Sequence, residues 1–207
     1  MNNFKNISTI IFDFGDVIVN LNLALCIQKF KDLGLTDIEK YLSNFGQKEI
    51  FLKFENGEIN TTEFLNEIRN LTDLPLSDLE IQDAWCAFLA DIPQQRIELL
   101  EKLKPRFRLL LLSNTNPLHI EVNAMKEFAR YGKTMYDYFD KCYLSYEMKL
   151  TKPNADIFQA LLADAQLNPE ECLFLDDGLK NIEAASQIGI QTYLVTPNDD
   201  LSFLLKI

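Results

Sequence analysis

The sequence predicts an α/β protein whose parallel sheet has helices on both faces and whose first strand is followed by an inserted helical unit. From residue 93 onward, short apolar runs alternate with helical patterns, which is typical of βαβ units. Residues 22–92 show helical spacing of apolar side chains and no convincing strand. We therefore expect a core domain of residues 1–20 and 93–207 and a helical domain of residues 21–92.

The first strand is predicted over Ile7–Phe12, a run rich in β-branched residues that ends at Asp13. An ionised carboxylate inside a buried strand is unfavourable unless it is paired. At the end of the strand, with the permissive Gly15 two residues later, the carboxylate is better placed for chemistry at the sheet edge. Taken alone, the pattern also fits an ordinary strand-to-turn boundary.

The helical unit shows repeated helix-start patterns. Thr36, Asn60 and Ser77 are each followed three residues later by Glu, the spacing of a capping box. Gly34 and Gly57 fall where helices should end. These patterns predict about four helices.

The C-terminal part continues the alternation, with Pro93 predicted as the first residue of a helix. The predicted strands are 107–112, 142–144, 172–175 and 192–195. The predicted helices are 96–103, 155–165 and 182–188.

Composition narrows the class of function. A formal net charge of −11 argues against nucleic-acid binding, because phosphate backbones select basic surfaces. No run approaches 18 apolar residues and the N-terminus lacks the apolar segment of a signal peptide, so we expect no membrane partner and a cytoplasmic protein. The four cysteines form no C-x-x-C pair and are expected to be reduced core thiols.

Polar residues follow four of the predicted strands. Asp13 ends the first, the run 113–116 follows the second, Lys152 precedes the helix after the third, and the run 176–178 follows the fourth. Because parallel strands point their carboxyl ends at one edge, these residues should meet in one site. Individually, Ser113 and Lys152 also fit plain turn and helix-start positions.

The residue types favour one chemistry. Clustered carboxylates are unfavourable without a cation, and Mg²⁺ prefers a few oxygens together with water and phosphate. Lysine, a hydroxyl and backbone N–H groups suit a phosphate. An Asp held beside both can attack phosphorus and form an aspartyl phosphate.

With these motifs in place, the chain resembles the haloacid dehalogenase-like hydrolase superfamily along essentially its whole length. The motifs "DFGDVIVN", "LLSNTNPLH", "TKP" and "FLDDGLKNIEAA" are most similar to a sugar-phosphate phosphatase subgroup that includes α-glucose-1-phosphate phosphatases. The resemblance implies a Rossmann-like three-layer core with a parallel sheet and an inserted helical-bundle cap of type 1. It also implies a small phosphorylated metabolite as substrate and Mg²⁺ as cofactor.

The resemblance assigns roles by motif position. Asp13 would be the nucleophile and a metal ligand, and Gly15 would offer its backbone carbonyl to the metal. Asp177 would supply a metal-binding carboxylate with Asp176 beside it, and Asn181 matches a distal acid of the fourth motif. The residues implied to surround the phosphoryl group are Phe14, Gly15, Ser113, Asn114 and Lys152, of which Lys152 is also catalytic.

One position departs from the pattern of the family. Phosphatases of the superfamily usually carry a second Asp two residues after the nucleophile, where this chain has Gly15. Asp16 is one residue further on, and a shift by one residue changes the direction of a side chain. General acid catalysis contributes typically ~10²–10⁴-fold, so slower catalysis is expected rather than none.

Three other functions compete with a phosphatase. A catalytically idle module that still binds metal and phosphate is favoured only by Gly15. A metal-free haloacid dehalogenase would have little use for Asp176 and Asp177. A phosphohexomutase would need an acid/base near the nucleophile, which Gly15 does not provide.

Substrate choice is expected to lie in the helical unit. The turn 55–58 occupies the place where type 1 caps carry their specificity loop, although a solvated helix connection fits equally well. Phe45, Lys48 and Phe51 either face the cleft or belong to the core of the cap. His119 either touches substrate or is a histidine of a surface loop.

Overall fold

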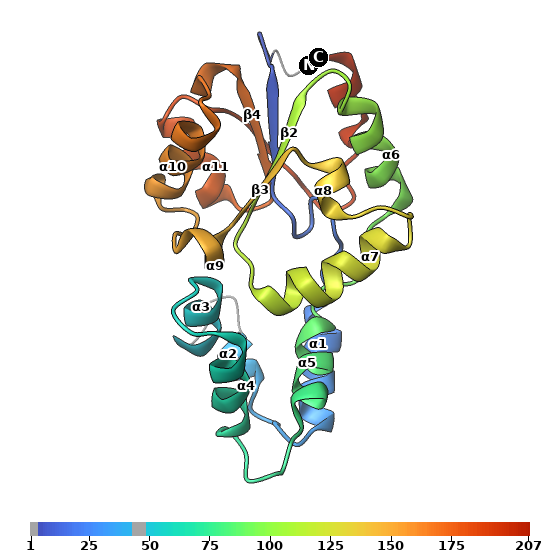
Figure 1. Cartoon of the computed structure of the whole chain (residues 1–207), viewed down its shortest axis with the longest axis vertical. Helices are drawn as coiled ribbons and strands as arrows, with labels where there is room; N and C mark the ends of the chain where they lie inside the picture. The colour runs from blue at the N-terminus through green and yellow to red at the C-terminus, as the bar shows by residue number, and fades with distance from the viewer. Residues whose placement is uncertain (1–3, 43–48) are drawn as a thin grey trace.

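The computed structural model describes residues 4–42 and 49–207, and its α/β part is built on one parallel sheet (Figure 1). The sheet has the order β3-β2-β1-β4-β5, so the first strand of the chain is the central one. The predicted α/β fold class with a parallel sheet is therefore confirmed. The strands are β1 Thr9–Phe12, β2 Arg108–Ser113, β3 Lys141–Leu144, β4 Cys172–Asp176 and β5 Gln191–Leu194.

Alternating side chains of the sheet pack into two separate apolar layers. Ile10 and Phe12 of β1 face the layer formed with α6, α7 and α8, whereas Ile11 faces the layer formed with α10 and α11. These strand residues are completely buried, as expected for a parallel sheet that is covered on both faces. The result is three layers, with helices on each side of the sheet (Figure 1).

The helices of this part agree with the predicted positions apart from their ends. Pro93 is the N-cap of α6 rather than its first helical residue, because its ψ of 138° is extended. The π-helix η1 and the short helices α7, α8 and α9 were not predicted. The helices and turns are α6 Gln94–Leu103, η1 Leu118–Ala124, α7 Met125–Ala129, α8 Met135–Tyr138, α9 Ser145–Met148, α10 Ala155–Ala165, η2 Pro169–Glu171, α11 Leu179–Gln187 and η3 Leu201–Lys206.

The helical unit has five described helices instead of the four expected. Asn60 and Ser77 form complete capping boxes with Glu63 and Glu80, as their spacing predicts. Aromatic side chains dominate its core, where Phe51, Phe64 and Trp85 are in mutual contact. The helices are α1 Leu23–Asp32, α2 Glu39–Leu42, α3 Glu49–Glu55, α4 Thr61–Arg69 and α5 Asp78–Cys86.

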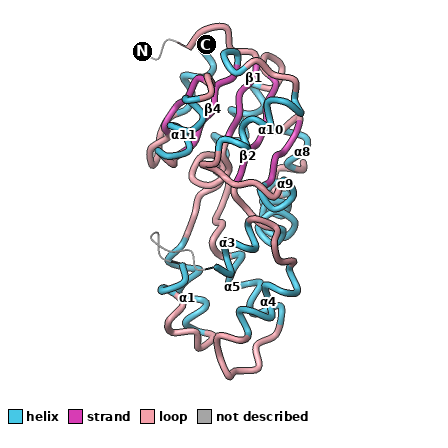
Figure 2. The backbone as a smooth tube through the Cα atoms, turned by 90° about the vertical axis from the view of Figure 1, so that its left-hand side faces the viewer, coloured by secondary structure: helices cyan, strands magenta, loops and turns pink. Residues whose placement is uncertain are grey.

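Two antiparallel segments join the helical unit to the α/β part (Figure 2). Asn20 N–H donates to the carbonyl of Asp91 (2.9 Å), and Asn22 N–H donates to the carbonyl of Phe88 (2.7 Å). The chain thus leaves and re-enters the α/β part at one place, near the predicted boundaries at residues 20 and 93. The division into two domains stays a prediction.

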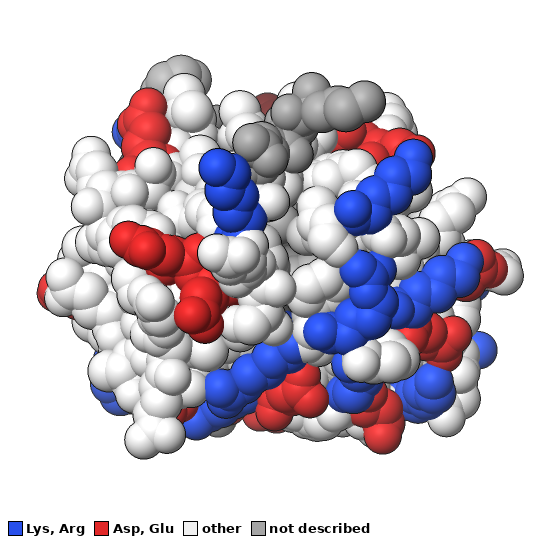
Figure 3. Space-filling model, turned by 90° about the horizontal axis from the view of Figure 1, so that it is seen from above, with Lys and Arg blue, Asp and Glu red and all other residues white. Residues whose placement is uncertain are grey.

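The surface carries charges of both signs. Figure 3 views the end of the molecule that carries both termini, where Lys and Arg side chains lie among Asp and Glu side chains. The formal net charge of −11 is therefore not matched by a uniformly acidic face at this end. Within the residues that the structure describes, no helix is long and apolar enough to cross a membrane.

Candidate active site

A cavity of about 140 Å³ lies where the carboxyl ends of β1, β2 and β4 face the helical unit. All but one of the residues predicted for the site line it; Asp176 lies directly behind, as described below. The lining residues are Asp13, Phe14, Gly15, Leu21, Glu55, Phe88, Leu89, Ser113, Asn114, Thr115, His119, Lys152, Asp177 and Asn181.

Lys152 lies between two carboxylates at the floor of this cavity. Its Nζ donates to Asp13 Oδ1 (2.6 Å), to Asp176 Oδ2 (2.7 Å) and to the carbonyl of Leu112 (3.0 Å). All three ammonium hydrogens therefore have an acceptor, and only 2% of the side chain is exposed. Burial acts to lower the pKa of Lys152, but Asp13 and Asp176 together hold it above its ordinary value. Lys152 is thus charged and fixed in place.

Asp13 is nearly buried at the end of β1. Its backbone N–H donates to the carbonyl of Leu175 (2.8 Å), which extends the pairing of β1 with β4 by one residue. Burial raises the pKa of Asp13 to about 7, and the negative charge of Asp176 adds to the rise, while Lys152 opposes it. The predicted nucleophile therefore depends on nearby positive charge to stay ionised.

Asp176 ends β4 and is completely buried. Besides Lys152, it accepts hydrogen bonds at Oδ1 from the backbone N–H of Gly178 (2.7 Å) and from Asn181 Nδ2 (2.8 Å). A Cβ at Gly178 would lie 2.9 Å from that oxygen and 2.8 Å from the amide nitrogen of Asn181. Glycine is therefore required here for the two donors to reach Asp176.

Three carboxylates could hold a metal ion. Asp13, Asp176 and Asp177 each offer one oxygen, and these oxygens lie within 4.8 Å of one another. The pKa of Asp177 is raised by partial burial and by the charges of Asp176 and Asp16, a repulsion that a bound cation would relieve. A set of hard oxygen donors fits Mg²⁺. Because both oxygens of Asp176 already accept hydrogen bonds, Asp177 is the better placed of the pair to bind metal directly.

The loop after β2 is attached to the Lys152 segment. Asn114 Nδ2 donates to the carbonyl of Lys152 (2.9 Å), and Asn114 Oδ1 accepts from the backbone N–H of Lys152 (2.9 Å). Asn114 thus positions Lys152, and its amide nitrogen carries a second hydrogen that can serve a ligand in the cavity. Ser113 is buried at the same wall, with a hydroxyl group suited to an anion.

Phe14 and Gly15 offer only their backbone to the cavity. The ring of Phe14 is buried and stacks on Phe128 in the core, with the ring centroids 6.3 Å apart. Gly15 does not adopt a left-handed conformation, and the nearest atoms to a Cβ built on it belong to the Leu21 side chain, the closest at 3.0 Å. The backbone at the position that lacks the usual second Asp therefore suits an ordinary residue, provided that the Leu21 side chain shifts by a few tenths of an ångström.

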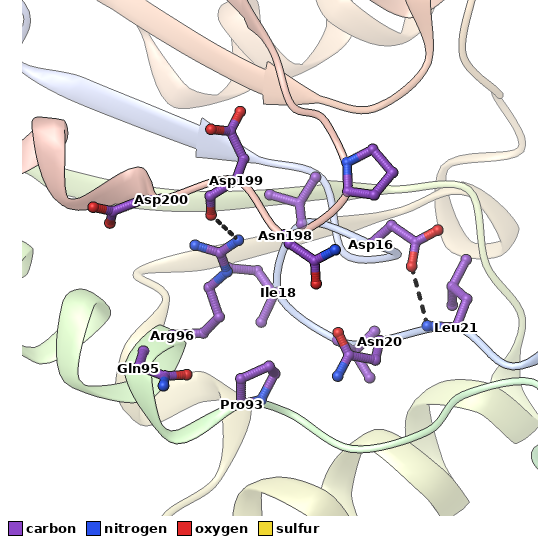
Figure 4. Close-up of a pocket in the computed structure, with 13 residues that line it drawn as sticks. Asp16, Ile18, Asn20, Leu21, Pro93, Gln95, Arg96, Asn198, Asp199 and Asp200 are labelled. Atoms are coloured by element: carbon purple, nitrogen blue, oxygen red, sulfur yellow. Dashed lines mark hydrogen bonds between the residues drawn. The ribbon is translucent and has the colours of Figure 1, made fainter.

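Asp16 lines a different space. It belongs to an outer groove of about 640 Å³ together with Asn20, Arg96 and Asn198, as Figure 4 shows. Its backbone is left-handed (φ 51°), and its Oδ1 accepts a hydrogen bond from the N–H of Leu21 (3.1 Å; Figure 4). Among the described residues that line the cavity with Asp13, Asp16 is absent.

His119 is not the histidine of a surface loop, one of the two alternatives for it. It lies at the start of η1, is 3% exposed and packs against the rings of both Trp85 and Phe88, which also contact each other. Its Nε2 lies 3.2 Å from the carbonyl of Trp85 and its Nδ1 lies 3.1 Å from the amide nitrogen of Asn116, which fits a neutral ring protonated on Nε2. Burial lowers the pKa of His119 to about 4, so at neutral pH the ring is uncharged and is not an imidazolium that could act as a general acid.

The helical unit supplies cavity residues that sequence periodicity did not identify. Leu21, Phe88 and Leu89 form an apolar wall, and Glu55 adds a buried acid from the end of α3. Phe51, an alternative for the cleft, belongs instead to the aromatic core of the helical unit. Phe45 and Lys48 lie outside the described residues. An apolar helix face that lines a cleft and one that packs in a core show the same helical spacing, so the sequence pattern does not distinguish between them.

Ser145 was also missed. It follows β3 directly and is completely buried, with its hydroxyl between the loop after β2 and the helical unit. Applying the strand-end argument to the third strand as it was applied to the other strands would have identified it.

Comparison with known proteins gives consistent matches along the chain. Residues 7–189 match the haloacid dehalogenase-like hydrolases. A D-ribitol-5-phosphate phosphatase of Bacteroides thetaiotaomicron is 35% identical over 187 residues, which cover 90% of this chain and 91% of that protein.

Solved structures of HAD family proteins also match this chain over most of its length. A HAD family enzyme of Bacteroides thetaiotaomicron, in complex with magnesium and inorganic phosphate, is 39% identical with a TM-score of 0.90 and covers 96% of this chain and 98% of its own. A HAD-like family hydrolase from Porphyromonas gingivalis is 36% identical with a TM-score of 0.87, covering 94% of each chain.

Proposed function

The chain belongs to the haloacid dehalogenase-like hydrolases, and we propose that it is a magnesium-dependent phosphatase that hydrolyses a small sugar or polyol phosphate. The observation that carries this proposal is the Lys152 ammonium held between Asp13 and Asp176, with Asp177 beside them. A relative named as a D-ribitol-5-phosphate phosphatase and a solved relative that contains magnesium and phosphate support it.

Asp13 is the proposed nucleophile. Its carboxylate oxygen would form a bond to phosphorus while the bond from phosphorus to the substrate oxygen breaks, leaving an aspartyl phosphate. Water would then attack phosphorus and release the Asp13 carboxylate together with inorganic phosphate. Lys152 offsets the negative charge between Asp13 and the phosphoryl group, and the Ser113 hydroxyl and the free N–H of Asn114 would hold the phosphoryl oxygens.

Asp13, Asp177 and the backbone carbonyl of Gly15 would hold Mg²⁺, with Asp176 behind them. When bound, the ion neutralises charge on the phosphate and on the clustered carboxylates. Residues 1–20 and 93–207 would thus carry the chemistry, and residues 21–92 would act as a cap that closes over the alcohol part of the substrate.

A second candidate is a protein that binds metal and phosphate without turnover. It is favoured by one observation, the absence of an acidic side chain at Gly15. The two candidates differ in their effect on p-nitrophenyl phosphate, whose leaving group needs no proton donor.

The test is a phosphate-release assay on p-nitrophenyl phosphate, D-ribitol 5-phosphate and a panel of other sugar phosphates, with Mg²⁺ or with EDTA. We expect Mg²⁺-dependent turnover that falls by ~10⁴-fold or more in Asp13→Asn. Metal titration should show a larger loss of affinity in Asp177→Ala than in Asp176→Ala. Metal and phosphate binding without release of p-nitrophenol would favour the idle module.

A further inference from the structure

Ser145 holds the backbone of the loop 113–116, here called the phosphate loop. Its hydroxyl accepts a hydrogen bond from the N–H of Thr115 (2.9 Å) and lies 3.1 Å from the carbonyl oxygen of the same residue. Ser145 is completely buried and Thr115 is nearly so, which keeps bulk water away from these contacts. One hydroxyl therefore contacts the peptide groups on both sides of Thr115.

These peptide groups adjoin the groups that are expected to meet the phosphate. The Thr115 N–H belongs to the peptide that follows Asn114, whose side chain fixes Lys152 through two hydrogen bonds of 2.9 Å. The backbone N–H of Asn114 has no acceptor among the residues that the structure describes, and Asn114 lines the cavity. A shift of this peptide would displace Asn114, and with it both a donor for phosphate and the support of Lys152.

The hydrogen of the same hydroxyl is directed to the helical unit. Ser145 Oγ lies 2.6 Å from the backbone carbonyl of Glu55, at the end of α3, which lies below α9 in Figure 1. A hydroxyl carries a single hydrogen, and the Glu55 carbonyl is the closer of its two acceptors. Because hydrogen bonds in a chain polarise one another, donation to Glu55 strengthens the bond from Thr115.

The turn after Glu55 packs on α9, the helix that begins at Ser145. Gly57 is left-handed (φ 66°), and a Cβ built on it would lie 2.1 Å from the carbonyl oxygen of Tyr146. Lys149 Nζ donates to the carbonyl of Gly57 (3.0 Å). The backbone of the turn thus touches the backbone of α9, which keeps the Glu55 carbonyl within reach of Ser145.

We propose that Ser145 is a positioning residue, which fixes the phosphate loop in its active geometry while the turn after α3 is packed on α9. This inference rests on the proposed phosphatase function. When the turn lifts away, the hydroxyl hydrogen can turn to the carbonyl of Thr115, so that no buried donor is left unpaired. The bond from the Thr115 N–H then loses its polarised partner, and Asn114 is held less firmly beside Lys152. Phosphoryl transfer is thereby tied to the contact between the helical unit and α9.

The experiment measures kcat and KM on p-nitrophenyl phosphate and D-ribitol 5-phosphate, and the affinity for inorganic phosphate by calorimetry, all with Mg²⁺. For Ser145→Ala we expect kcat/KM to fall by roughly 10- to 100-fold on both substrates, because both carry the phosphoryl group that the phosphate loop holds. The affinity for inorganic phosphate should fall by about 10-fold, since the donors of Asn114 are displaced.

Lys149→Met is the matched control, because it removes another contact between α9 and the same turn without touching the phosphate loop. Lys149 is exposed, so kcat/KM on p-nitrophenyl phosphate and the phosphate affinity should stay within about threefold of wild type. Ser145→Cys keeps the volume of the buried side chain but is a weak donor and acceptor. It should show the same loss of phosphate affinity in a protein whose thermal unfolding remains cooperative.

Wild-type phosphate affinity in both Ser145 variants would overturn the inference and leave the phosphatase function standing. A loss confined to D-ribitol 5-phosphate would also overturn it, because Ser145 would then act on the helical unit alone. So would an equal loss of phosphate affinity in Lys149→Met, which leaves the phosphate loop untouched. If wild type releases no phosphate from either substrate, the proposed function fails and the inference falls with it.

Discussion

Lys152 balances the charge of the site, since it is the buried cation between two buried carboxylates. We expect Lys152→Ala to lower kcat/KM by roughly 10²–10³-fold, because a charge on the transferring phosphoryl group loses its partner. The free energy of unfolding should fall by about 3–5 kcal/mol, because Asp13 and Asp176 are left unpaired. Lys152→Arg should rescue activity only in part, since a planar guanidinium does not match the three acceptors around Nζ.

Phosphate-release kinetics and chemical denaturation measure these effects, with the exposed Lys180→Ala as the control. The double variant Lys152→Ala/Asp176→Asn should regain stability but not activity. Wild-type activity in Lys152→Ala would remove Lys152 from the chemistry.

Gly15 and Asp16 are the two positions at which to test how the departing oxygen obtains its proton. If Gly15 leaves no efficient donor, the rate should depend steeply on leaving-group pKa across a series of aryl phosphates. Asp16→Asn should leave that slope unchanged, since Asp16 lines the outer groove and accepts from Leu21 N–H. Gly15→Asp should flatten the slope, because the backbone at Gly15 is not left-handed and a Cβ there requires only a small shift of the Leu21 side chain. A shallow wild-type slope that steepens in Asp16→Asn would instead identify Asp16 as the donor.

At the scale of single elements, η1 is tied to α5 by a buried polar network. Asn116 Oδ1 accepts from the backbone N–H of His119 (3.1 Å) and from the indole of Trp85 (3.2 Å). Asn123 Nδ2 donates to the carbonyls of Cys86 and Leu89, both at 2.7 Å. The end of α5 is therefore fixed to the α/β part by polar contacts in addition to apolar packing.

This network should be sensitive to acid. The pKa of His119 is lowered to about 4 in the folded protein, against about 6.5 in the unfolded chain, so the unfolded chain binds more protons between these values. Above pH 6.5 neutral His119 makes its full contribution to the free energy of unfolding. This contribution is lost as the pH falls toward 4, and the loss is on the order of 3 kcal/mol. The measurement is the difference in unfolding free energy between wild type and His119→Gln at pH 7 and pH 4.5.

The raised pKa of Asp13 changes the free energy of unfolding in the opposite direction over an overlapping pH range. Its raised pKa favours the folded metal-free protein below about pH 4 and that contribution is lost as the pH rises to about 7. The two groups partly cancel in wild type, so only the difference from His119→Gln isolates the histidine. A difference that does not change with pH would mean that His119 is solvated.

How well the sequence predicted each element depended on which interactions determine the element. The apolar run ending at Leu112 and the spacing in Ala155–Ala165 are local, so those elements were predicted nearly to the residue. His119 was left between two alternatives because its burial depends on Trp85 and Phe88, which are distant in sequence. No local pattern records such partners.

In the candidate site, too, some features could be predicted from the sequence, whereas others depend on tertiary contacts. The strand-end argument identified Asp13 and Lys152 without knowledge of their partners, because the topology of a parallel sheet fixes where strand ends meet. The place of Glu55 at the cavity depends on how the turn that follows it, residues 55–58, packs on α9, which is a tertiary contact. Sequence spacing therefore predicted the residues that meet on the sheet side of the cavity better than those that line it from the helical unit.

At the scale of the whole molecule, the packing of the turn 55–58 of the helical unit, here called the cap turn, against α9 should depend on Gly57. Gly57→Ala introduces a side chain in a left-handed conformation and also a collision with the backbone of Tyr146. Gly132 is the matched control, because it is also left-handed (φ 74°) but has nothing within 4 Å of a Cβ. We expect Gly132→Ala to cost about 1–2 kcal/mol and Gly57→Ala clearly more.

Hydrogen exchange should locate the effect of Gly57→Ala in α3 and α9, as expected if the cap turn lifts away from the α/β part. Equal destabilisation by the two variants, without faster exchange in those helices, would show that the turn is not held against α9.

The central position of β1 has a consequence for how the protein forms during synthesis. β1 is made first, but its two neighbours in the sheet, β2 and β4, begin at Arg108 and Cys172. Both pairings close long loops and so raise the contact order, which slows folding. The helical unit is contiguous in sequence and has an aromatic core of its own, so it can fold on the emerging chain before β1 has paired with β2 and β4. Asp13 is therefore made before the two strands that enclose it, and until the sheet closes around it, its carboxylate is hydrated and ionised like that of any exposed Asp.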